Sequence, residues 1–206
     1  MFLELLKTVA AHVGVVPKPA YIVIMFFCYS LIGYCLECVV LTVDNRKLTI
    51  DRGFVRHLPF CIIYGFGGII GFALLRPFAG NWLLLFVTGA LCATAFEYFT
   101  AQLQLRIFGS FWWDYTEKPF NYKGILCLES TLGWGIVALI IVNVLHRNLA
   151  GLVQQIPLHI ATPVAFILLA AYVLDFIVSA RVATQQKHAQ AAAPSFEENT
   201  ALWGKE

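Results

Sequence analysis

Hydrophobic residues form five long runs that short polar segments separate. The runs cover residues 21–43, 60–75, 82–105, 125–145 and 158–180. A helix needs roughly 17–25 mainly apolar residues to cross a bilayer, so the pattern predicts five transmembrane helices. The second run is the shortest, is rich in glycine and is closed by Arg76 and Pro77.

The two ends of the chain differ from this pattern. Residues 1–18 are apolar but interrupted by Glu4 and Lys7, and they are too short to span, so we expect a short interfacial helix rather than a signal peptide. Residues 182–206 are rich in Ala, Gln and Glu, which predicts a mostly disordered tail after a helical start. The transmembrane domain is therefore expected over 19–181.

Composition places the chain in the membrane. Hydrophobic residues make up 60% and charged residues 13%, with a mean hydropathy of +0.76, whereas soluble domains carry about 25% charge. The predicted fold is an all-α polytopic bundle. No basic tract suggests nucleic acid as a partner, and no local nucleotide or zinc motif suggests a cofactor or metal. Cys35 and Cys38 are interpreted as small buried apolar residues.

Lys and Arg residues set the expected orientation. Four lie on the side of the N-terminus and ten on the other side, namely Arg46, Lys47, Arg52, Arg56, Arg106, Lys118, Lys123, Arg181, Lys187 and Lys205. Loops rich in Lys and Arg stay in the cytoplasm. The chain is thus expected in the cytoplasmic membrane, with its N-terminus outside and its C-terminus inside.

The order of features suggests an internal repeat of two hairpins. A helix with Glu37 precedes a polar loop, Cys61 and a glycine-rich helix, and a helix with Glu97 precedes a polar loop, Cys127 and a second glycine-rich helix. Two parallel hairpins related in this way would place both acids near the centre of the bundle.

Four acids fall inside the predicted spans: Glu37, Glu97, Glu129 and Asp175. A charge in the bilayer centre costs at least about 2.5–3.5 kcal/mol, so each acid should face protein or water. Small residues share the helix faces of two of them: Ser30 and Gly33 with Glu37, and Ala90, either Ala93 or Thr94, and Ala101 with Glu97. Such faces predict close contact between helices. Asp175, six residues before Arg181, is expected near the interface.

Two interpretations of the acids stay open. They could pair with Arg52, Arg56, His57 or Arg106 and fix the bundle. Alternatively, they could line a polar cavity, and the expected site residues are Glu37, Glu97, Glu129, Arg52, Arg56 and Tyr64.

The segment 112–130 is the most polar stretch between two apolar runs. Trp112, Trp113, Asp114 and Tyr115 combine aromatic rings with charge, and Asn121 follows them. Amphipathic rings are typical of the membrane–water boundary. The segment is predicted to be either an interfacial loop or a lid over the polar site, folded against the 44–59 loop, with Asp114 reaching an arginine or capping a helix.

Several blocks together resemble a known family. They are Tyr29–Gly33 with Glu37, Arg52–Phe54, Pro59–Cys61, Ile63–Gly67, Ala95–Phe99, Trp112–Tyr115, Phe120–Asn121, Gly124–Leu128 and Gly133–Gly135. Over residues 22–180 the chain resembles the CmpB-type ABC-transporter type IV permeases, which are small multi-spanning membrane proteins. The resemblance implies a permease subunit. Ile125 departs from it, because a basic residue is expected there.

Three functions follow from these observations. The first is a transporter permease subunit with an acidic polar site in the cytoplasmic half, handling a small charged solute. The second is a membrane-embedded enzyme or lipid-binding protein acting on a headgroup, with His57 and Tyr115 near the acids. The third is a structural or regulatory subunit. The expected partners are the bilayer, a second copy or another membrane subunit; the sequence identifies no catalytic residue.

Overall fold

The computed structural model describes residues 18–50, 57–111 and 113–192. The described chain is helical, with 78% helix and no strand in those residues. In chain order the helical elements are α2 (Pro19–Asn45), α3 (Ile62–Leu75), η1 (Arg76–Phe78), α4 (Trp82–Phe108), α5 (Leu128–Ile140), η2 (Ile141–Leu145), α6 (His146–Gln154) and α7 (Leu158–Ala192). This confirms the all-α class. The expected interfacial helix at 1–18 lies outside the described residues.

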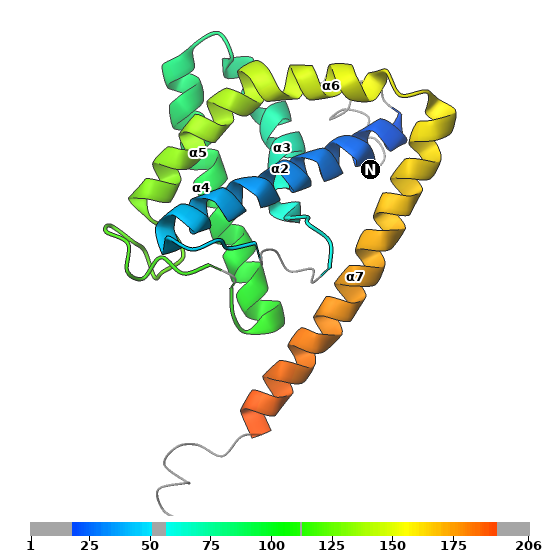
Figure 1. The fold of residues 1–206 in the computed structure, drawn as a ribbon. Coiled ribbons are helices and arrows are strands. Elements are labelled where there is room, and N and C mark those ends of the chain that lie inside the picture. Colours follow the sequence, from blue (N-terminus) through cyan, green and yellow to red (C-terminus); the bar gives the residue numbers. More distant parts are fainter. Residues whose placement is uncertain (1–17, 51–56, 112, 193–206) are drawn as a thin grey trace, which may run out of the picture.

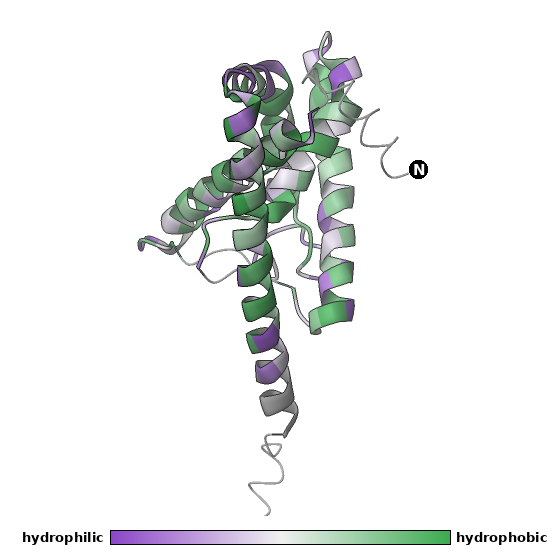
Figure 2. Cartoon of the chain, turned by 90° about the vertical axis from the view of Figure 1, so that its right-hand side faces the viewer, coloured by the Kyte–Doolittle hydropathy of each residue, from purple (hydrophilic) through white to green (hydrophobic). Residues whose placement is uncertain are grey.

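Four helices are long and apolar enough to cross a membrane. They are Pro19–Val43, Trp82–Phe108, the joined helix Leu128–Gln154 and Leu158–Val182, and the shorter apolar helix Ile62–Phe78 accompanies them. These segments match the five predicted runs. Figure 2 shows hydrophobic residues along most of α7, with hydrophilic residues gathering toward its C-terminal end. The helix continues to Ala192, so the predicted tail begins as a helix, and its disorder stays a prediction.

Local sequence explains where the helices begin and end. Pro19 stands at the start of α2, where its missing N–H is not needed. The Asn81 side chain accepts hydrogen bonds from the N–H groups of Leu83 and Leu84 and caps α4. α4 ends at Phe108, and Gly109 caps it with a φ of 78°, the left-handed conformation that glycine tolerates.

The long helix 128–154 is bent at η2. η2 is a π-helical segment, an irregularity that commonly kinks a helix. Figure 1 shows α5 and α6 as two arms that meet there, with α6 lying across the end of the bundle. A core cluster that includes Met25, Leu85, Ala138 and Ala161 joins α2, α4, α5 and α7.

The helices pack as two hairpins, α2 with α3 and α4 with α5. The small residues of both faces are buried: Ser30 and Ala101 are 0% exposed and Ala90 is 6% exposed. In each hairpin a cysteine, Cys61 or Cys127, occupies the N-cap of the second helix. The two hairpins therefore share this order of features. The symmetry axis that would relate them as an internal repeat stays a prediction.

α7 packs mainly against α2. Its C-terminal half extends beyond the other helices (Figure 1). The Asp175 side chain, 7% exposed, fixes the segment before α3 to this helix, because it accepts the N–H groups of His57 (3.0 Å) and Leu58 (2.8 Å). Asp175 is therefore buried in a helix–loop contact, and its place near the membrane interface stays a prediction.

Candidate functional site

The site is built around Glu97 on α4, a carboxylate only 3% exposed. Three side chains donate hydrogen bonds to it: the Tyr115 hydroxyl at 3.1 Å, the Ser130 hydroxyl at 3.1 and 3.3 Å, and the Trp134 indole N–H at 3.0 Å. All three donors are neutral. Within the described part of the chain, no Lys, Arg or His forms an ion pair with Glu97.

Helix geometry explains why these donors converge. Ser130 and Trp134 are four residues apart on α5 and therefore lie on one face of it. Glu97 lies three turns before the end of α4, about 16 Å along the axis at 1.5 Å per residue. Since α5 starts beside Glu97, the connecting segment 109–127 must fold back along the last three turns of α4.

Tyr115 belongs to this connecting segment and closes the site from its side. Burial and, after it, the charge of the Glu97 carboxylate raise the pKa of Tyr115 above the ordinary phenol value. The phenol therefore stays protonated and remains a donor at neutral pH. The lid role that the sequence suggested for Tyr115 stays a prediction.

A second acid, Glu37 on α2, lies near enough to interact electrostatically with Glu97. The Cys61 thiol donates to Glu37 at 3.6 Å, and a side-chain hydrogen bond joins Glu37 and Tyr64. Tyr64 is in turn within electrostatic range of Tyr115. The structure thus brings together four of the residues that the sequence singled out, from α2, α3, α4 and the 109–127 segment.

Glu129 does not join this cluster. Its side chain is 66% exposed and forms a salt bridge of 3.1 Å with Lys118. Ser130, the next residue, faces Glu97 instead, because successive residues of a helix point in directions about 100° apart. Arg52, Arg56 and Trp112 lie outside the described residues.

The remaining lid residues shape the 109–127 segment itself. Trp113 donates its indole N–H to the Ile125 carbonyl at 2.8 Å, and Asn121 donates to the carbonyls of Thr116 and Lys118. Asp114 is exposed and accepts the N–H (2.9 Å) and hydroxyl of Thr116. Among the described residues, Asp114 therefore stabilises a local turn.

His57 and Tyr115, considered together at the sequence level, are held by different acids. His57 Nδ1 lies 2.8 Å from Asp175 Oδ1, whereas Tyr115 is bound to Glu97. This separation gives no support to a shared acid–base site.

Sequence reasoning missed three residues of the site, all on α5: Ser130, Thr131 and Trp134. Ser130 and Trp134 carried a usable signal, since they share a face at a spacing of four residues. Thr94, one turn from Glu97, donates to the Thr131 hydroxyl at 3.1 Å and continues the polar contact between α4 and α5. Its partner on α5 could not be inferred from local spacing.

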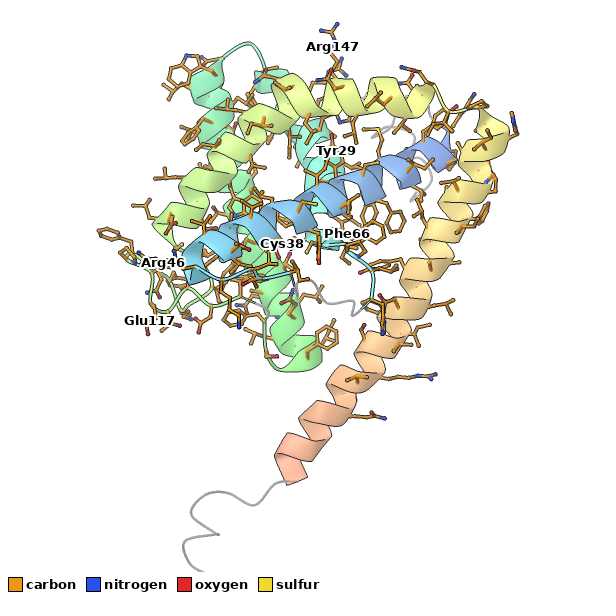
Figure 3. All side chains as sticks on the ribbon, in the orientation of Figure 1. Tyr29, Cys38, Arg46, Phe66, Glu117 and Arg147 are labelled. Carbon is orange, nitrogen blue, oxygen red and sulfur yellow. The ribbon has the colours of Figure 1, made fainter. Side chains whose placement is uncertain are left out.

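A separate buried contact joins α2, α3 and α6. The Tyr29 hydroxyl and His146 Nδ1 are 2.7 Å apart, and the His146 ring stacks on Phe72 with centroids 3.5 Å apart. Arg147, the next residue, points away from the bundle (Figure 3). His146 follows the π-helical η2 directly, so this contact lies at the bend of the helix.

Comparison with known proteins gives one match. The family described as "Putative ABC-transporter type IV" matches residues 24–180. No curated protein and no solved structure shows significant similarity to the chain.

Proposed function

Because the chain belongs to the CmpB-type ABC-transporter type IV family, we propose that it is a permease-type membrane subunit whose polar site at Glu97 receives a small cationic solute. The site would lie in the cytoplasmic half of the bundle, where the Lys and Arg distribution places the 109–127 segment.

The hydrogen bonds of Glu97 carry this proposal. The Glu97 carboxyl accepts four contacts from Tyr, Ser and Trp, and hydrogen bonds donated to a carboxyl favour its ionised form. Neutral donors reduce the cost of burial but leave the negative charge in place. Ionisable residues inside a membrane usually mark ion or substrate pathways, and this charge favours a cation.

The surroundings are consistent with a path for the solute. Tyr115 covers the carboxylate from the 109–127 segment, so a solute from that side would have to displace the phenol. The Thr94 and Thr131 hydroxyls extend the polar contact between α4 and α5 beyond Glu97. The two threonines would provide the next oxygen ligands.

Transport and binding in liposomes test the proposal. Purified protein should take up or bind members of a panel of small organic and inorganic cations. Glu97→Gln keeps the side-chain volume and one acceptor oxygen but removes the charge. It should weaken binding about tenfold or more, because a charge-assisted contact contributes about 1.5–3 kcal/mol.

Glu117→Gln is the matched control. Glu117 is exposed at the edge of the 109–127 segment (Figure 3), and its substitution should leave uptake unchanged. Equal uptake by Glu97→Gln and the native chain would reject Glu97 as the site. Failure of every cation to bind or move would reject the cationic solute itself.

A further inference from the structure

Phe120, at the tip of the 109–127 segment, combines two unfavourable features. Its side chain is 83% exposed, and its φ of 55° is in the left-handed region that residues with a Cβ rarely adopt. A phenylalanine ring has no polar atom that would gain from water. No side chain in the described part of the chain covers it, so the conformation presents the ring to something outside the protein.

The rest of the segment holds this conformation in place. The Asn121 side chain bonds to the Thr116 and Lys118 carbonyls and accepts the Gly124 N–H at 3.2 Å. The Tyr115 N–H donates to the Gly124 carbonyl at 2.9 Å. These hydrogen bonds hold the turn on both sides of Phe120. The exposure of the Phe120 ring therefore follows from an ordered turn.

The neighbours of Phe120 have the chemistry of a membrane surface. Tyr122 is 52% exposed and lies beside Tyr98, with ring centroids 6.4 Å apart. The Lys123 ammonium lies over the Tyr122 ring, 5.4 Å from its centroid. Aromatic residues and lysines with an apolar stem and a polar tip are typical of the boundary between hydrocarbon and water.

The position of the segment also points to the bilayer. It connects the candidate spans Trp82–Phe108 and Leu128–Gln154 and folds back along the last three turns of α4, so it lies on one side of the bundle. Irregular backbone exposed to lipid is not tolerated in the hydrocarbon core, so the segment itself must stay at the level of the headgroups or in water. An apolar ring at its tip can reach the adjoining acyl chains.

From these observations we propose that Phe120 and Tyr122 form an interfacial anchor, which inserts the Phe120 ring into the headgroup–acyl boundary of the bilayer. The charges of the segment balance, with Asp114 and Glu117 against Lys118 and Lys123. The anchor therefore recognises the amphipathic boundary itself and does not require anionic headgroups. This inference is independent of what Glu97 binds.

The test places 4-fluorophenylalanine at position 120 of the full chain in phosphatidylcholine vesicles. Fluorine relaxation is measured with a nitroxide on the acyl chain near the headgroup and, separately, with a water-soluble gadolinium chelate. We expect several-fold stronger relaxation by the lipid nitroxide than by the chelate. The same probe at Phe166, 69% exposed within the α7 span, is the control for a ring in lipid.

Two outcomes would overturn the proposal. Stronger relaxation by the chelate would place the ring in water. Weak relaxation by both agents, with a normal response at position 166, would show that a protein surface covers Phe120, either a second copy or another subunit. The fluorine changes the ring little, so none of these results depends on a destabilising substitution.

Discussion

Asp114 shows how one side chain orders the segment that covers the site. Its carboxylate accepts both the N–H and the hydroxyl of Thr116. Gly124 faces this turn at a φ of 68°, and a Cβ there would lie 2.7 Å from the Thr116 hydroxyl. The hydroxyl and then the backbone N–H of Thr116 hold the pKa of Asp114 below its usual range.

This lowered pKa predicts acid sensitivity of the turn. Because the folded turn binds the proton less readily than the unfolded segment, its stabilising effect is complete above the ordinary pKa of about 3.9 and is lost as the pH falls through the lowered value. Hydrogen exchange should show the Thr116 amide protected at neutral pH and unprotected in acid. Asp114→Ala should lack this protection throughout, and pH-independent protection in the native chain would contradict the assignment.

At the scale of one element, the hairpin of α2 and α3 shows how single glycines allow two helices to pack closely. A Cβ at Gly68 would lie 2.4 Å from the Tyr29 ring, whereas a Cβ at Gly67 would meet nothing within 4 Å. Tyr29 in turn holds His146 at the start of α6. Gly68 therefore controls the approach of three helices.

The two glycines give a matched pair of variants. Gly68→Ala should destabilise the fold by about 1–3 kcal/mol, because the added methyl overpacks a buried contact. Gly67→Ala should change stability by no more than about 1 kcal/mol, and in the stabilising direction, since alanine favours a helix more than glycine does. Unfolding in mixed detergent micelles measures both. Equal changes in the free energy of unfolding for the two substitutions would show that the Tyr29 ring moves to make room for the added methyl group at position 68.

At the scale of the whole molecule, the topology depends on the shortest apolar helix. Ile62–Phe78 covers about 26 Å at 1.5–2.0 Å per residue, slightly less than the roughly 30 Å hydrocarbon core. If it crosses, five crossings place the termini on opposite sides. If it does not, the termini share one side.

We predict that Ile62–Phe78 crosses, with Gly80 outside and the C-terminus in the cytoplasm, as the positive-inside rule requires. A C-terminal fluorescent protein, which folds in the cytoplasm, should fluoresce. A tag inserted directly before Gly80, where a Cβ would meet nothing within 4 Å, should be cleaved by external protease in intact cells. A tag protected at position 80 would reverse the assignment of this helix.

The sequence by itself determined the membrane class, the number of apolar helices and the family. Each of these depends on local properties: the length and hydropathy of a run, a proline or capping residue at its end, or a block such as Trp112–Tyr115. The burial of Ser30 and Ala101 could also be predicted, because small residues on one helix face favour close packing wherever the neighbour comes from.

Only the tertiary structure decided which acid received which partner. Glu97 and Glu129 are both acids inside apolar runs of the sequence. In the structure, Glu97 is buried among neutral hydrogen-bond donors, whereas Glu129 is exposed and forms a salt bridge with Lys118. Asp175 binds His57, more than a hundred residues away. Hydropathy measures the cost of placing a carboxylate in the membrane, but the groups that offset this cost come from other helices, and their distances are fixed only when the helices pack.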